Sequence, residues 1–399
     1  MVEHREFNRF RKSAMPKNVC QLCPDEPVEL TESNNSREHI IPNAIGGRKK
    51  IGGFVCQECN KQTGDTWDAE LSKQLNFLCL FLGIERDRGV TPSMIVDTSV
   101  GPLKLHHDGT QSLARPIYEV QQFDKSGKLK IQASTLKEAK NLIKRAKSEF
   151  PQLDVDAALD SLKIQDTISL KIVHATLNFG GEKSGRSLVK SCLALAWDAG
   201  IDAGQCPLAI EYLKNGGEAN FGYFYEKDLI LHRPADSIFH CVSVSGDPTS
   251  KMLLGYVEYF SAHRVVVCLS NQYSGRKFSK TYAIDPRSGV ELDLGVDLRF
   301  SVEDMRAIYN YDRIPDGAMQ AAMEEVMRIG YAAQKERQTK KILEDAAAYG
   351  IANCGAKYGE IMTEEHCKKL SQLVAEKLAP LLLHGNGAIH QKTLEFPEK

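Results

Sequence analysis

The sequence carries two cysteine pairs whose spacing suits a metal ion. Cys20 and Cys23 form the first CxxC pair, Cys56 and Cys59 form the second, and residues 24–55 lie between them. Four thiolates in this pattern match one tetrahedral Zn²⁺. Because protein atoms would fill all four positions, this zinc would be structural rather than catalytic. We therefore expect a small zinc-stapled unit near the N-terminus; the alternative is four buried cysteines without a metal.

Three further side chains near these pairs are suited to hydrolysis. Glu38 and His39 are adjacent between the two pairs, and Asn60 directly follows the last cysteine. Carboxylate and amide oxygens are ligands that suit Mg²⁺, and a neutral imidazole can take a proton from an attacking water. One metal ion and one base are sufficient to hydrolyse a phosphodiester. The residue types therefore predict a hydrolytic site beside the zinc unit.

These residues lie in a pattern that resembles a known family. The segments EHIIPNAIGG (38–47) and VCQECNKQTG (55–64) are similar to the HNH endonucleases of the ββα-metal, or His-Me finger, fold, over about residues 18–80. The resemblance implies that His39 is the general base and that Glu38 and Asn60 hold a catalytic Mg²⁺ or Mn²⁺. It also implies that Gly46 and Gly47 shape the hairpin turn. The alternative is a zinc ribbon that only binds a partner.

One position departs from the family pattern. The family carries a central Asn shortly before the third cysteine, which braces the hairpin and orients the base, but residues 50–54 read KIGGF here. Asn43 is the nearest candidate and lies in another part of the motif. Either a backbone carbonyl orients His39 in a shortened loop, or the activity is weak.

Basic residues around the motif suggest contacts to phosphate. The whole chain has a formal net charge of −1, so any argument for nucleic-acid binding has to be local. Contacts of this kind would position the nucleic-acid backbone and carry little base information. The alternative is a solvated charged surface. The candidate residues are Arg37, Arg48, Lys49, Lys50 and Lys61.

Composition and periodicity predict the fold that carries this site. With 399 residues, 42% hydrophobic and 26% charged, the chain is long enough for two or three globular domains. We expect an α+β fold with a zinc-stapled ββα-metal finger in residues 1–95, a mixed α/β targeting or sensor domain with an antiparallel meander in 96–300, and a helical region in 301–399. A hairpin is expected around 124–127, a helix over 187–200, and a loose tail over the last dozen residues.

A glycine-rich segment raises a second kind of site. GGEKSGRS (180–187) has the spacing of a phosphate-binding P-loop before a helix, except that Arg186 replaces the lysine. An anion site at the helix N-terminus remains open, and a plain glycine-rich connection is favoured.

The combined interpretation is a metal-dependent HNH endonuclease that cleaves DNA, most simply double-stranded DNA, in a prokaryotic restriction or anti-phage defence role. Two alternatives stay open: an effector nuclease activated by a cyclic nucleotide or a protein partner, and a catalytically weak zinc-finger adaptor that binds nucleic acid. The helical region would suit a homodimer. The sequence shows neither a membrane-spanning run nor a signal peptide, which predicts a cytoplasmic protein.

Overall fold

The computed structural model describes residues 18–395, apart from 25, 27, 88, 99–100, 124–125, 161–162, 170–172, 175–176 and 385–388. The described chain divides into two compact units. Unit 1 takes in residues 18–78, 84–89 and 178–329, and unit 2 takes in residues 79–83, 90–177 and 330–395. These boundaries differ from the three consecutive regions expected from the sequence, because the segment 178–329 groups with the N-terminal finger.

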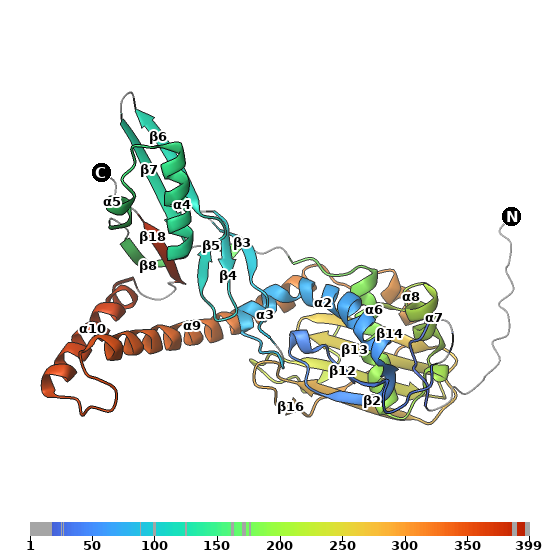
Figure 1. The fold of residues 1–399 in the computed structure, drawn as a ribbon. Helices are drawn as coiled ribbons and strands as arrows, with labels where there is room; N and C mark the ends of the chain where they lie inside the picture. The colour runs from blue at the N-terminus through green and yellow to red at the C-terminus, as the bar shows by residue number, and fades with distance from the viewer. Residues whose placement is uncertain are drawn as a thin grey trace. The chain divides into compact units, whose positions relative to one another are not determined.

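The finger of unit 1 is a hairpin followed by a helix (Figure 1). Its strands pair antiparallel, and its turn needs two glycines. Gly46 has a φ of 100°, and a Cβ on Gly47 would lie 1.8 Å from the carbonyl oxygen of Ile41. The elements are β1 (Asn35–His39), the 3-10 turn η1 (Asn43–Ile45), β2 (Lys50–Cys56), α1 (Gln57–Thr63), the π-helical turn η2 (Gly64–Asp68) and α2 (Ala69–Gln74).

A six-stranded antiparallel sheet forms the rest of the core of unit 1. Its strand order is β10-β14-β13-β12-β15-β16, so the predicted meander is confirmed in the hairpins that join β12, β13 and β14. Helix α6 packs across β12–β15. The elements are α6 (Glu182–Asp198), η3 (Ala203–Gln205), α7 (Pro207–Asn215), β10 (Phe221–Tyr223), β11 (Ile230–Leu231), β12 (His240–Asp247), β13 (Met252–Tyr259), β14 (His263–Ser270), β15 (Phe278–Ile284), β16 (Glu291–Leu292), β17 (Gly295–Val296) and α8 (Val302–Tyr309).

Hydrogen bonds fasten the finger to this sheet and to α6. The fully buried His240 of β12 accepts a hydrogen bond at Nδ1 from the backbone N–H of Phe260 and donates from Nε2 to the carbonyl oxygen of Ile45, at 3.0 and 2.8 Å. Burial lowers the pKa of His240 to about 4, so this imidazole stays neutral. The indole of Trp197 in α6 donates to the carbonyl oxygen of Gly52 at 3.2 Å. The finger is therefore part of the larger core of unit 1.

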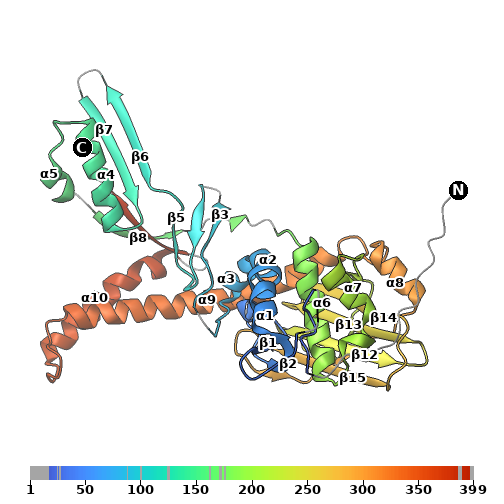
Figure 2. The same cartoon turned by 45° about the vertical axis from the view of Figure 1, so that its right-hand side comes forward.

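Unit 2 contains a second sheet, with the order β6-β7-β18-β5-β4-β3-β9 and β8 paired to β18. The predicted hairpin is confirmed as β6 and β7, and α4 lies along it (Figure 2). The elements are α3 (Asn76–Leu82), β3 (Met94–Thr98), β4 (Leu103–Leu105), β5 (Gln111–Leu113), β6 (Ile117–Phe123), β7 (Ser126–Ala133), α4 (Leu136–Glu149), α5 (Val155–Asp160), β8 (Lys163–Ser169), β9 (Val173–His174), α9 (Ala318–Asn353), α10 (Glu364–His384) and β18 (Ile389–Glu395). Helices α3 and α9 each run across a boundary between the units.

The α+β class, the N-terminal strand-and-helix region and the helical C-terminal region are confirmed. Two expectations are wrong in detail. The helix expected over 187–200 begins at Glu182, and the tail expected to be loose contains β18, which pairs with β8 from 163 to 169. Short polar strands such as β18 are specified by their long-range partner rather than by their own pattern. No helix among the described residues is long and apolar enough to cross a membrane.

Candidate active site

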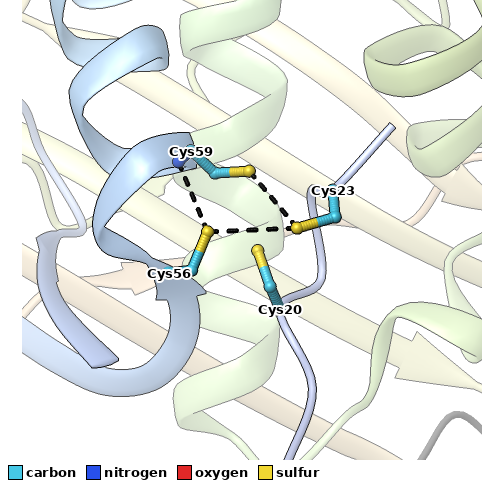
Figure 3. A group of neighbouring side chains, drawn as sticks. All are labelled: Cys20, Cys23, Cys56 and Cys59. Carbon is cyan, nitrogen blue, oxygen red and sulfur yellow. Dashed lines mark hydrogen bonds between the residues drawn. The ribbon is translucent and has the colours of Figure 1, made fainter. Parts of the chain in front are cut away.

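The four cysteines of the two CxxC pairs converge on one point in the finger (Figure 3). All four Sγ atoms lie within 4.8 Å of one another and all four residues are buried. The Sγ of Cys23 is 3.6 Å from that of Cys59 and 3.9 Å from that of Cys56. A tetrahedral Zn²⁺ with Zn–S bonds of about 2.3 Å places its sulfurs about 3.8 Å apart. The donor set and its geometry therefore fit a structural zinc ion.

Local structure explains why the sulfurs converge. Cys56 ends β2 and caps α1, where its Sγ accepts from the backbone N–H of Cys59 at 3.4 Å. Hydrogen bonding from Cys59 lowers the pKa of Cys20 to about 5, which favours the thiolate that a metal requires. The chain's eleven cysteines all lie in the described residues and all are free thiols.

Strand β1 carries the two residues predicted to do the chemistry. Its pairing with β2 contains a bulge between Ser36 and Glu38, after which Glu38 pairs with Ile51 and His39 with Lys50. Successive side chains on a strand point to opposite faces. Accordingly, Glu38 is buried, with 3% of its surface exposed, whereas the side chain of His39 is 21% exposed.

On the buried face, Glu38 belongs to a charge network that the sequence analysis did not find. The ammonium of Lys190 in α6 lies 2.6 Å from Oε1 of Glu38 and 2.6 Å from Oδ2 of Asp68, which ends the π-helical turn. Burial disfavours the charge on Lys190, but attraction to Asp68 and Glu38 outweighs it and raises the lysine pKa. Burial raises the pKa of Glu38, and the lysine charge opposes that shift. The hydroxyl of Ser187 donates to Oδ1 of Asp68 at 2.6 Å.

This network also accounts for the glycine-rich segment. Gly180 and Gly181 both have positive φ, and α6 begins directly after them. Ser187 and Lys190 then face the finger, where the hydroxyl of Ser187 donates to Asp68 and the ammonium of Lys190 donates to Glu38. The segment therefore starts the helix that supplies a buried counter-ion to Glu38 and Asp68. A lysine in an otherwise apolar helix stretch is the signal that could have pointed to this role.

On the open face, His39 lies beside Asp87, the second residue that the sequence analysis missed. Nε2 of His39 is 3.5 Å from Oδ2 of Asp87 and has no hydrogen-bond partner among the described residues. Arg48 and Lys50 also bind this carboxylate and hold the pKa of Asp87 well below its usual range. Burial, followed by the charge of Lys50, lowers the pKa of His39, and Asp87 opposes this shift. The imidazole is therefore neutral at pH 7, the form a general base requires.

Asn60, the first-turn residue of α1 that was predicted as a metal ligand, lies against β1. Its Nδ2 donates to the hydroxyl of Ser36 at 2.5 Å and to the carbonyl oxygen of Arg37 at 3.3 Å. Both contacts use the amide nitrogen, so Oδ1 keeps its acceptor capacity. In Glu38 the oxygen held by Lys190 is Oε1, which leaves Oε2. Carboxylate and amide oxygens of this kind are the donors that hard divalent cations take, and Lys190 holds the other carboxylate oxygen of Glu38 at 2.6 Å.

The basic residues predicted to bind phosphate fall into two groups. Arg48 and Lys50 bind Asp87, and Lys49 lies 2.9 Å from Asp198 in α6, so these three are already in ion pairs. Arg37 and Lys61 are exposed and have no ion pair to a described residue. Arg37 and Lys61 are therefore available to bind phosphate, whereas Arg48, Lys49 and Lys50 form ion pairs within unit 1.

Comparison with known proteins supports the finger on independent grounds. A family model described as HNH endonuclease matches residues 20–76, a span that begins at the first zinc-cluster cysteine and includes Glu38, His39 and Asn60. No curated protein and no solved structure matches the chain. The span contains the complete four-cysteine cluster. Residues 20–76 therefore match the HNH endonuclease family, and the four cysteines within this span form a cluster that fits zinc.

Proposed function

We propose that the chain is a metal-dependent endonuclease that hydrolyses phosphodiester bonds of double-stranded DNA, with His39 as the general base. The observation that carries the proposal is a neutral, partly exposed imidazole on β1, which directly follows Glu38 in the sequence. A base of this kind takes the proton of the attacking water. The divalent cation, when bound to Glu38 and Asn60, supplies charge stabilisation to the phosphate and the departing oxygen.

We infer that Asp87 takes the orienting role of the missing central Asn, through its approach to 3.5 Å from Nε2 of His39. Its carboxylate faces Nε2, which favours the tautomer with the proton on Nε2 and leaves Nδ1 to accept a proton from water. Arg48 and Lys50 form ion pairs with the same carboxylate and hold it in place. The contact favours an active nuclease over the catalytically weak adaptor, because the base has an orienting group despite the absence of Asn at positions 50–54.

Arg37 and Lys61 are the exposed cations of the finger that can contact phosphates of the nucleic-acid backbone. We also propose that the protein is cytoplasmic and acts in restriction or anti-phage defence, by analogy with similar domain fusions. An activating nucleotide, a protein partner and a homodimer remain predictions. The glycine-rich segment at 180–181 no longer supports a nucleotide site, because the next residues that it positions hold Asp68 and Glu38.

Replacing His39 with Ala is the direct test. We expect plasmid cleavage in Mg²⁺ or Mn²⁺ to fall by about 10²–10⁴-fold, the usual contribution of a general base, while the protein keeps its zinc and its melting temperature. The matched control is His107→Ala, which removes an exposed histidine that lies outside the finger. Full cleavage by the His39 variant would refute the assignment. Absence of cleavage by the wild-type protein, with intact DNA binding, would favour the adaptor or the activated effector.

The role of Asp87 is tested separately with two variants. Asp87→Ala is expected to lower the single-turnover cleavage rate by about 10-fold or more, as loss of an orienting partner does. Asp87→Asn is expected to recover most of that rate, because its amide oxygen can face the same Nε2–H. Saturating protein should be used, since freeing Arg48 and Lys50 changes DNA affinity as well. Equal rates for the Ala and Asn variants would show that Asp87 does not orient the base.

A further inference from the structure

Helix α4 of unit 2 has one exposed face that carries lysines at helical spacing. Lys137, Lys140 and Lys144, here called the α4 lysine stripe, are all exposed. Their spacing of three and four residues places them on one side of the helix, about 5 Å apart along its axis. The opposite side is buried through Ala139, Ile143 and Ala146, where α4 packs on β7 (Figures 1 and 2).

The acidic residues of α4 bind groups other than these three lysines. Glu138 accepts from the backbone N–H of Ser134 at 3.0 Å. Glu149 accepts from the hydroxyl of Tyr118 at 2.7 Å and from Arg145 at 2.9 Å. In contrast, the three lysines of the stripe form no ion pair with any residue that the structure describes. In this they differ from Arg48, Lys49 and Lys50 of the finger, which form ion pairs with Asp87 and Asp198.

The like charges of the α4 lysine stripe lower the stability of the helix. Like charges three or four residues apart destabilise a helix by about 0.2–0.5 kcal/mol per pair. The fourth lysine in the row, Lys147, differs from these three because it donates to the carbonyl oxygens of Pro151 and Leu153, both at 2.7 Å. Helix α5, which carries Asp156 and Asp160, packs against α4, but neither aspartate forms an ion pair with the stripe among the described residues. Three unpaired ammonium groups in a row complement a partner with regularly spaced negative charges.

We propose that the α4 lysine stripe is a docking surface for the phosphate backbone of double-stranded DNA. A DNA strand presents a phosphate for every 3.4 Å or so of helix axis, so lysines about 5 Å apart on flexible stems can each meet a different phosphate. Lysine ammonium groups act as point charges and do not read bases bidentately, so the contact is independent of sequence. The inference rests on the proposed function, because it gives the nuclease a second contact with its DNA substrate outside the finger.

The test compares two triple variants of the full-length protein with the same loss of charge. The first is Lys137→Gln, Lys140→Gln and Lys144→Gln. The control is Lys340→Gln, Lys368→Gln and Lys369→Gln, which removes exposed lysines from α9 and α10. In the control, Lys340 and Lys368 already have acidic neighbours on their own helices. Affinity for a fluorescein-labelled DNA duplex is measured by anisotropy over a series of salt concentrations, without added divalent cation.

We expect the stripe variant to bind DNA about 10-fold or more weakly at low salt, and to show a shallower dependence of log K on log salt by up to about 2.7, or 0.9 for each lost phosphate contact. The control should bind like wild type. If both triple variants weaken binding equally, or if neither does, the stripe is not a docking surface, while cleavage by the wild-type protein still upholds the proposed function. If the wild-type protein neither binds nor cuts DNA, both proposals fail.

Discussion

Replacing Lys190 with Met is expected to lower the free energy of unfolding of unit 1 by about 3–5 kcal/mol, the usual effect of removing one partner from a buried ion pair. The side chain of Lys190 is 1% exposed and lies 2.6 Å from both Glu38 and Asp68. Without its ammonium, two carboxylates remain close together in a site with little water. The same change should abolish cleavage, because Glu38 loses the group that holds it in place.

Denaturant unfolding followed by circular dichroism measures this effect. The matched control is Lys183→Met, which removes an exposed lysine from the same helix and should change stability by less than about 0.5 kcal/mol. The triple variant Lys190→Met, Glu38→Gln and Asp68→Asn should recover much of the lost stability, because it removes the charges together. An unchanged midpoint for Lys190→Met would show that the network does not support the fold.

Loss of the zinc cluster should have the largest effect on the finger itself. Cys59→Ser is expected to reduce bound zinc from one ion per chain to almost none, since the remaining three sulfurs of the cluster cannot close a structural site. Structural zinc contributes about 10–16 kcal/mol to the folding of small finger peptides. The hairpin that carries Glu38 and His39 should therefore become sensitive to protease, and cleavage of DNA should stop.

Zinc content by elemental analysis and limited proteolysis read out this prediction on the full-length protein. Cys367→Ser is the control, because Cys367 is an exposed free thiol outside the cluster. Treatment of the wild-type protein with a strong chelator should reproduce the proteolysis pattern of Cys59→Ser, and added Zn²⁺ should reverse it. A Cys59→Ser protein that keeps its zinc and resists protease as Cys367→Ser does would contradict the assignment of these sulfurs as ligands.

The local pattern of the sequence was sufficient to predict the finger. CxxC pairs, the Glu-His step and the asparagine after the last cysteine are all encoded within about sixty residues, and their geometry depends mainly on one hairpin and one helix start. The glycines at 46 and 47 also follow from local backbone requirements. The same holds for the hairpin of β6 and β7 and for the meander, where each strand pairs with its neighbour in the chain.

Tertiary structure alone decided which charged groups serve the site. Lys190 meets Glu38 across 152 residues of sequence and Asp68 across 122, and Asp87 meets His39 only because the chain returns to the hairpin after α3. The sequence grouped Arg48, Lys49 and Lys50 with Arg37 and Lys61, although the first three are already paired inside unit 1. The physical reason is that a charge's role depends on the neighbours that compensate it at a few ångströms. Those neighbours are brought together by packing, which a local pattern does not specify.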